Sequence, residues 1–366
     1  MDQRWSNRAA SAEAAVTTRH LDRLWGLPGT QLGVVGWPST RKDRAFGTWH
    51  YWWQAHLLDT LVDAQLRDPQ PERVGRIRRQ IRGHHLRNIG RWTNSYYDDM
   101  AWLALALERA GRLVGVGRPG ALATLGRQLL GAWMPELGGG IPWRKQDRFF
   151  NAPANGPAGI FLARHHSLHR AQETADWIDN TLIDPETKLV FDGIKAGSLV
   201  RAQYTYCQGI VVGLETELAV RTGEDRHRDR VARLVAAIGE HMTHGGVLRG
   251  AGGGDGGLFA GITARYLALA ATTLPGDSAA DVAARDAAAD IVLASARAAW
   301  DNRQSVDGLP LFGAFWGRAP EIPRPGVAAG KRVGGAVTES AAPERDLSVQ
   351  VSGWMLMEAA HTVAGR

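Results

Sequence analysis

The sequence predicts an all-α protein, an (α/α)6 barrel of about twelve alternating inner and outer helices. Three observations lead to this fold. Apolar residues recur with helical spacing along most of the chain. The alternation of apolar and polar residues that is typical of strands is nearly absent, and two kinds of helical segment follow each other in alternating order. One kind is rich in Ala and Leu and apolar on nearly every face, as buried helices are, and the other is amphipathic, as covering helices are.

The inner, apolar segments begin at intervals of roughly fifty residues, which is the rhythm of six helical hairpins closed in a ring. We expect inner helices near 48–67, 96–112, 152–168, 203–222, 257–275 and 346–363. We expect outer helices near 6–24, 71–89, 118–133, 171–183, 224–242 and 279–299.

All twelve helices are expected to form one catalytic domain over residues 1–366. Long Gly- and Pro-bearing connections precede several inner helices, and connections of this length are usually functional or disordered. If all inner helices start at one end of the barrel, these connections gather around one cleft. We expect residues 317–345 to form a long loop within the domain that can move.

The composition is that of a globular protein, with 44 % hydrophobic and 22 % charged residues. No apolar run is long enough to span a bilayer, and the first residues lack the apolar stretch of a secretory signal. We therefore expect a cytoplasmic protein, with export by another route left open. The single cysteine, Cys207, excludes an intramolecular disulfide and a thiolate metal cluster.

The net charge of +6 raises the question of nucleic-acid binding. The densest basic cluster lies on one amphipathic segment, at 71–89, with no aromatic residues interleaved. We interpret it as a solvated helix face, and we expect a monomer with no nucleic-acid partner. Fourteen tryptophans are unusual, and core packing and sugar stacking explain them equally well.

The most informative run is Asn94-Ser95-Tyr96-Tyr97-Asp98-Asp99-Met100-Ala101-Trp102, in which two aspartates open an apolar helix. Helix capping, with Ser95 as the N-cap, would explain Asp98 alone. Glycoside cleavage would explain both, because it takes one ionised and one protonated carboxyl group. Neighbours on a helix point about 100° apart, so their carboxyl groups can converge to the roughly 5 Å of a retaining enzyme.

These residues and others in the same order resemble glycoside hydrolase family 76, the endo-α-1,6-mannanases. The resemblance rests first on Tyr96-Tyr97-Asp98-Asp99-Met100-Ala101-Trp102 and extends from about residue 47 to 357. Four shorter segments agree with it, namely Gly138–Trp143, Asn151–Asn155, Tyr204–Gly209 and Phe259–Leu267. The resemblance implies retaining cleavage of α-1,6-linked mannan or mannooligosaccharides without cofactor or metal, with Asp98 as nucleophile and Asp99 as general acid/base.

The chain departs from the family pattern at three positions. Cys207 stands where the family usually has Asn, Ala260 where Lys is usual, and Phe150 where Lys commonly precedes Asn151. If those polar residues bind sugar hydroxyls, this protein has lost contacts, and its substrate can differ from that of its relatives.

Several further residues are candidates for substrate binding, each with a structural alternative. The tryptophan candidates can stack on a sugar or pack in the core. Asn151 and Asn155 can bind hydroxyls or be a helix N-cap with a polar neighbour at the surface, and Tyr206 and Gln208 can bind hydroxyls or make a buried hydrogen bond. The candidates are Asn94, Tyr97, Trp53, Trp143, Asn151, Asn155, Tyr206, Gln208 and Asp255. The pairs His84-His85 and His165-His166 are adjacent rather than four apart, so we expect no metal site there.

Two alternatives remain open. One is an exo-acting or transglycosylating enzyme of the same fold on a related α-mannoside, and product analysis would separate it from an endo-acting enzyme. The other is a glycan-binding protein without catalysis. Two repelling carboxylates argue against the second alternative, because a binding protein gains nothing from them.

Overall fold

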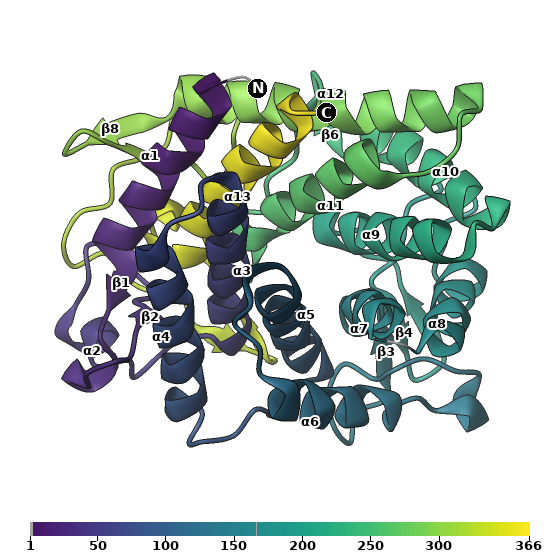
Figure 1. The fold of residues 1–366 in the computed structure, drawn as a ribbon, viewed down its shortest axis with the longest axis horizontal. Helices are drawn as coiled ribbons and strands as arrows, with labels where there is room; N and C mark the ends of the chain where they lie inside the picture. The colour runs from purple at the N-terminus through teal and green to yellow at the C-terminus, as the bar shows by residue number, and fades with distance from the viewer. Residues whose placement is uncertain (1–2, 166) are drawn as a thin grey trace.

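The computed structural model describes residues 3–165 and 167–366, and these residues form thirteen α-helices. Twelve of the helices make two concentric rings (Figure 1). The inner ring contains α3 (Tyr51–Arg67), α5 (Tyr97–Val114), α7 (Ala152–Arg164), α9 (Thr205–Thr222), α11 (Phe259–Thr273) and α13 (Leu347–Ala364). The outer ring contains α1 (Gln3–His20), α4 (Pro71–Arg87), α6 (Pro119–Leu130), α8 (Leu168–Thr181), α10 (Asp225–His241) and α12 (Ala279–Asn302).

Each inner helix contacts the next, and α13 contacts α3, so that the inner ring closes. Each outer helix packs mainly on one inner helix, α1 on α13, α4 on α3, α6 on α5, α8 on α7, α10 on α9 and α12 on α11, and α12 also contacts α13. The predicted (α/α)6 barrel is therefore confirmed, with every expected helix present.

The inner helices approach one another closely because small residues stand at their crossings. A Cβ on Gly213 of α9 would overlap the ring of Tyr266 on α11, and a Cβ on Gly209 would come within 2.6 Å of Thr263. Apolar side chains fill the rest of the interior as one large core. Burial of this kind contributes roughly 25 cal/mol per Å² and accounts for helices that are apolar on all faces.

The remaining elements are short and lie in the connections. Helix α2 (Arg41–Arg44) was not expected from the sequence. The strands are β1 (Leu21–Asp22), β2 (Leu32–Gly33), β3 (Phe149–Asn151), β4 (Gly193–Lys195), β5 (Ser198–Val200), β6 (Thr243–His244), β7 (Val247–Leu248), β8 (Gln304–Val306), β9 (Leu309–Leu311), β10 (Arg332–Val333) and β11 (Ala336–Val337). They form antiparallel pairs and one three-stranded sheet, β3-β4-β5, and are too short to show alternation in the sequence.

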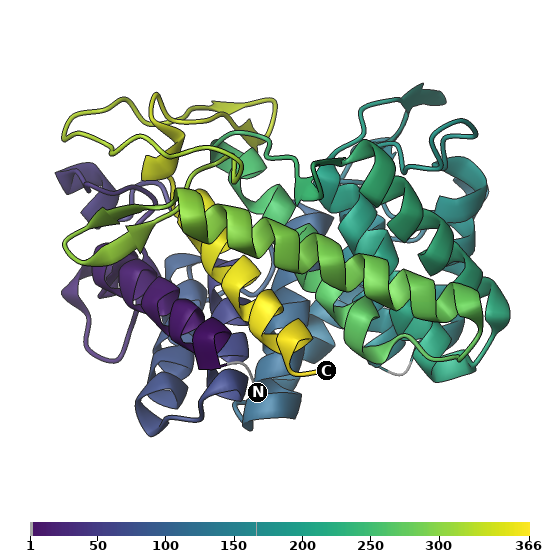
Figure 2. The same cartoon turned by 90° about the horizontal axis from the view of Figure 1, so that it is seen from above.

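The long connections gather at one edge of the molecule, away from the two chain termini (Figure 2). They precede the inner helices, so the N-terminal ends of those helices meet the connections at this edge. This arrangement agrees with the expectation that one cleft lies there.

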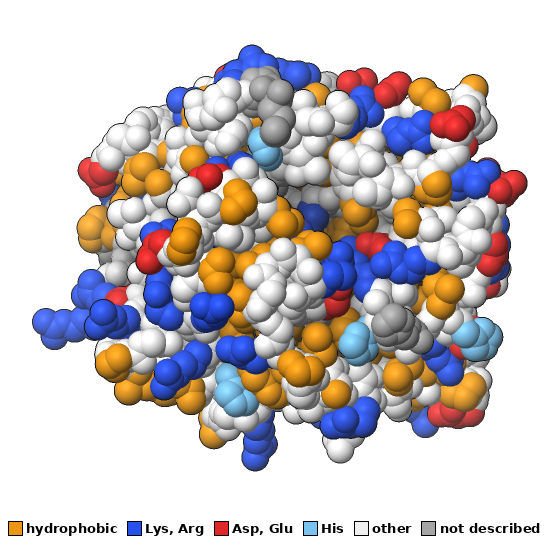
Figure 3. Space-filling view, viewed as in Figure 1, with side chains coloured by type: hydrophobic (Ala, Val, Ile, Leu, Met, Phe, Trp, Pro, Cys, Tyr) orange, Lys and Arg blue, Asp and Glu red, His pale blue; other side chains and the backbone are white. Residues whose placement is uncertain are grey.

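Some of the charged residues are paired, with arginines bonding acidic side chains of neighbouring helices. Arg73, from the basic cluster of α4, pairs with Glu13 of α1 at 2.7 Å. In the face seen in Figure 3, basic and acidic side chains are interspersed with apolar and uncharged ones. Among the described residues, no helix is long and apolar enough to cross a membrane.

Candidate active site

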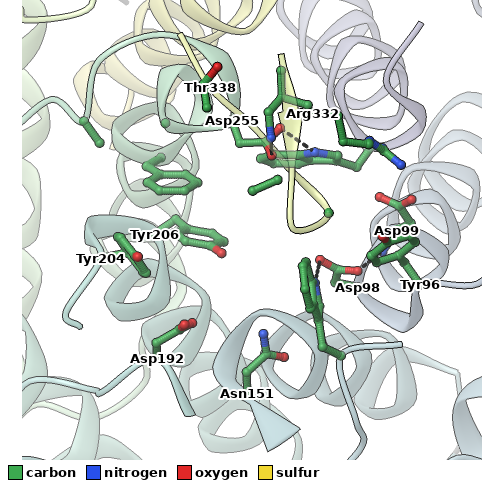
Figure 4. A pocket seen from close by; sticks show the side chains of 18 of the residues that line it. Tyr96, Asp98, Asp99, Asn151, Asp192, Tyr204, Tyr206, Asp255, Arg332 and Thr338 are labelled. Carbon is green, nitrogen blue, oxygen red and sulfur yellow. Dashed lines mark hydrogen bonds between the residues drawn. The ribbon is translucent and has the colours of Figure 1, made fainter. Parts of the chain in front are cut away.

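A cleft of about 440 Å³ opens at the N-terminal ends of the inner helices (Figure 4). Its walls come from five of these helices: Trp52 from α3, Asp98 from α5, Asn151 at the start of α7, Tyr206 from α9 and Phe259 from α11. The connections that precede the inner helices supply the rest of the wall, and the connection before the sixth inner helix is one of them. The barrel therefore brings residues from distant parts of the sequence to one place.

Asp98 and Asp99 are the second and third residues of α5, whose N-cap is Tyr96. The expectation that Ser95 caps this helix is therefore corrected, and the N-cap side chain makes no capping hydrogen bond. The Asp98 carboxylate accepts two hydrogen bonds, from the Trp143 indole Nε1 at 2.9 Å and from the backbone N–H of Asp99 at 2.8 Å. The Asp99 carboxylate accepts one from the Asn94 side-chain amide at 2.5 Å.

The electrostatics of the pair favour a shared proton. Burial, followed by the neighbouring charge of Asp99, raises the pKa of Asp98 well above its ordinary value. Burial raises the pKa of Asp99 to about 7, against the opposing effects of the Asn94 hydrogen bond and the Arg332 charge. Two buried carboxyl groups in contact with the same cleft do not both ionise easily, so one proton is held near neutral pH.

A third carboxylate, Asp255, lies in the cleft wall on the 3₁₀ helix Gly254–Leu258. One of its oxygens accepts from the Nε1 atoms of Trp52 and Trp53 at 3.1 and 2.9 Å, and the other accepts from the backbone N–H of Val337 at 2.7 Å. Asp255 therefore ties α3 to the β10–β11 hairpin that crosses the cleft.

The hairpin lies close to the carboxylate pair. A Cβ on Gly335, at its tip, would come within 2.7 Å of the Trp143 ring and 2.9 Å of the Tyr96 hydroxyl, and φ there is +106°. Only glycine fits this conformation and this space. Arg332, on β10, lines the cleft with its guanidinium 5.8 Å from the centre of the Tyr96 ring.

Four of the nine predicted binding residues line the cleft together with Asp98 and Asp99. They are Trp143, Asn151, Tyr206 and Asp255. The other five lie elsewhere. Asn94 contacts Asp99 from outside the cleft, Tyr97 packs against the core, and Trp53 lies beneath Asp255. Adjacent Trp52 takes the position in the wall that we expected of Trp53.

The amides Asn155 and Gln208 serve the backbone instead of the cleft. Asn155 is fully buried and bonds both the N–H and the C=O of Ile141, at 2.7 and 2.8 Å. Gln208 is also fully buried and bonds the N–H and C=O of Val190, at 2.7 and 2.9 Å. Each amide thus fixes a connection to an inner helix. For Gln208 this is the structural alternative that the sequence left open, whereas the surface position offered as the alternative for Asn155 is wrong because the side chain is fully buried.

The three departures from the family pattern also lie outside the cleft wall. Cys207, Ala260 and Phe150 are buried in the core, and burial raises the pKa of the Cys207 thiol well above its ordinary value. Substitutions at these positions therefore act on packing behind the wall.

Sequence reasoning missed several residues of the wall, above all Asp192, Arg332, Tyr204 and Trp52. Asp192 and Arg332 lie in connections with no local pattern that points to a cleft. Tyr204 stands two residues before Tyr206, and this repetition at the start of an inner helix was a usable signal.

The described residues contain no group of three or more His, Cys, Asp or Glu side chains placed to hold a metal ion. His84 is buried between Trp49 and Tyr51, in ring contact with both. Of the second histidine pair, His166 lies outside the described residues.

Comparison with known proteins agrees with this geometry. The model of glycosyl hydrolase family 76 matches residues 8–320. The α-1,6-mannanase of Salegentibacter sp. HEL1_6 superposes with a TM-score of 0.81 at 28 % identity, covering 98 % of this chain and 99 % of that one. An inactive variant of that enzyme, with two consecutive aspartates changed to asparagine and α-1,6-mannotriose bound, superposes equally well.

A protein from Listeria innocua superposes with a TM-score of 0.80 at 25 % identity, covering 98 % of this chain and 97 % of that one. A search of curated proteins finds no match.

Proposed function

The chain belongs to glycosyl hydrolase family 76, and on this premise we propose that it cleaves α-1,6-linked mannan or mannooligosaccharides with retention of configuration. As a member of this family it is a glycoside hydrolase. The linkage, the mechanism and the roles of individual residues are the content of the proposal.

The observation that carries the proposal is the adjacent pair Asp98 and Asp99, two carboxyl groups that line the same cleft and whose burial raises the pKa of each. In the proposed reaction Asp98 attacks the anomeric carbon while Asp99 gives its proton to the leaving oxygen. Asp99 then removes a proton from water, which attacks the glycosyl-enzyme and frees Asp98. The sugar keeps its α configuration because it is inverted twice.

The hydrogen bonds support this division of roles. Each oxygen of Asp98 accepts an N–H donor, and such donors stabilise the ionised form of a carboxyl group. Asp99 accepts a donor on one oxygen only and keeps the other for a proton. Burial raises the pKa of both groups, and that of Asp98 well above its ordinary value, which opposes this assignment. We give more weight to the two N–H donors, and on that ground we assign the ionised nucleophile to Asp98 and the proton to Asp99.

The linkage is supported by the relatives. The α-1,6-mannanase of Salegentibacter sp. HEL1_6 is inactive when two consecutive aspartates are changed to asparagine. Asp98-Asp99 is the one Asp-Asp pair in this sequence. The ring of Tyr206 stacked on Phe259, with centres 3.9 Å apart, offers an apolar wall suited to the C–H face of a pyranose.

Space on two sides of the pair favours internal cleavage. A second hollow of about 490 Å³ shares Tyr96, Asp99 and Arg332 with the cleft. Asp98 lines only the cleft, whereas Asp99 lines both the cleft and the second hollow. A leaving sugar beyond the cleaved bond can occupy the second space, next to the acid that protonates its oxygen.

The test is digestion of linear α-1,6-mannan by the purified chain, with chromatography of the products over time. Internal cleavage predicts an early ladder of oligosaccharides, and release of one end unit would contradict it. Asp98→Asn and Asp99→Asn should each lower kcat by several orders of magnitude while they fold normally. No hydrolysis by the wild-type chain would overturn the proposal.

A further inference from the structure

One carboxylate in the cleft has no hydrogen-bond or ion-pair partner among the residues that the structure describes. Asp192 is 9 % exposed and lines the cleft. Among the buried acidic side chains in the described part of the chain, it is the only one that makes neither a hydrogen bond nor an ion pair. All the others bond an arginine, a histidine, an amide, a hydroxyl or a backbone N–H.

An unpaired buried carboxylate is unfavourable for the folded chain, because burial removes its water and nothing replaces it. Burial alone raises the pKa of Asp192 to about 6, so most of the population is ionised at neutral pH. Evolution tolerates such groups mainly where a ligand completes them.

The backbone holds Asp192 rigidly in this position. Its N–H donates to the carbonyl of Ala202 at 2.7 Å, and its own carbonyl accepts from Ala152 at the start of α7 at 2.8 Å. The following residue, Gly193, pairs with Asn151 between β3 and β4, and a Cβ on Gly193 would come within 2.7 Å of the Asn151 Cα. This close pairing sets Asp192 beside Asn151.

Asp192 and Asn151 point into the space that Asp98 faces from the other side (Figure 4). The Asn151 Oδ1 caps α7 by accepting from Ala154 at 3.2 Å, which leaves its Nδ2 without a partner in the described structure. The wall therefore presents an acceptor with two oxygens next to a free amide donor.

We propose that Asp192, with Asn151 beside it, binds two neighbouring hydroxyl groups of the sugar that lies over Asp98, and so selects the mannosyl residue on the non-reducing side of the cleaved bond. A carboxylate accepts from two hydroxyls at once, and the amide donates to one of their oxygens. A cation is a poorer occupant, because Asp192 belongs to no group of three metal-binding side chains among the described residues. This inference rests on the proposed function.

The test compares the wild-type chain, Asp192→Asn and the control Asp147→Asn on α-1,6-mannotriose and on a panel of mannotrioses that each lack one hydroxyl. Asp147 is paired with Arg144 and stands outside the cleft wall. Turnover gives kcat/KM, and calorimetry gives the affinity for the same sugars.

On the complete sugar, kcat/KM of Asp192→Asn should fall about 10- to 100-fold, the usual effect of losing hydrogen bonds to a charged group. The wild type should discriminate against two of the deoxy sugars by a similar factor, and Asp192→Asn should not. Asp147→Asn should behave as wild type. The melting temperature of Asp192→Asn should match or exceed that of wild type, because a buried charge is removed.

Three results would overturn the inference. Asp192→Asn with wild-type kcat/KM shows that the carboxylate touches no sugar. A slow variant that still discriminates against the same deoxy sugars shows a purely structural role. A wild-type chain that neither binds nor cleaves any mannotriose overturns the proposed function along with this assignment, whereas the first two results leave the proposed function standing.

Discussion

The Trp143 indole donates a hydrogen bond to the Asp98 carboxylate at 2.9 Å in the cleft wall, from a position 45 residues further along the chain. This contact favours the ionised form of Asp98. It also fixes the direction in which the carboxylate points.

Replacement of Trp143 by phenylalanine should therefore lower kcat/KM about 10- to 100-fold. Loss of the donor raises the pKa of Asp98, so the acidic limb of the pH–rate profile should move to higher pH. Trp133→Phe, a change outside the cleft wall, is the matched control. An unchanged acidic limb in Trp143→Phe would mean that the indole does not hold the nucleophile ionised.

Asn94 should affect the alkaline limb of the pH–rate profile. Its amide bonds the Asp99 carboxylate and lowers the pKa of that group. In Asn94→Ala the pKa of Asp99 rises, and activity, which needs Asp99 protonated, should persist to higher pH than in the wild type. Initial rates measured from pH 4 to 9 give the profile, and an alkaline limb that stays in place in Asn94→Ala would mean that Asn94 does not set the pKa of Asp99.

Arg332 lowers the pKa of Asp99 through its charge rather than through a hydrogen bond. In wild type the rate should decline as pH rises through about 7, where Asp99 loses its proton. Arg332→Met should move this decline to higher pH. Because the guanidinium is exposed, the difference between variant and wild type should shrink in high salt, while the effect of Asn94→Ala should not. A salt-independent effect of Arg332→Met would argue for a direct contact instead.

Asn155 should stabilise the fold and should not bind the sugar. Asn155→Ala leaves the buried N–H and C=O of Ile141 without partners, which should cost about 3 kcal/mol of unfolding free energy in denaturant titrations. Asn180→Ala, at an exposed position of α8, should cost little. If Asn155→Ala unfolds like wild type but has a raised KM, the expectation from the sequence that it binds sugar would be restored.

The helices and the carboxylate pair could be predicted because their signals are local. Helical periodicity repeats within each segment, and Asp98 and Asp99 stand out as charges at the head of an apolar helix. The residues at which the helices begin and end were harder to predict. Helix α3 begins at Tyr51 rather than near 48 because His50 has φ of +47°, a value that the amino-acid pattern does not reveal.

The rest of the cleft could not be predicted because it depends on tertiary contacts. Asn151 and Asn155 lie four residues apart, yet one caps the helix beside the cleft and the other lies one turn deeper, against the Ile141 backbone. Asp192 and Arg332 reach the cleft from connections whose paths only the closed barrel determines.

The roles of the two aspartates are tested most directly by chemical rescue of Asp98→Ala and Asp99→Ala with azide on an aryl α-mannoside, with the product anomers identified by NMR. The assignment of Asp98 as nucleophile and Asp99 as general acid/base predicts that azide revives both variants. Asp98→Ala should yield the β-mannosyl azide, because azide replaces the nucleophile, and Asp99→Ala the α-mannosyl azide, because Asp98 still forms the glycosyl-enzyme. The opposite pairing of anomers and variants would contradict it.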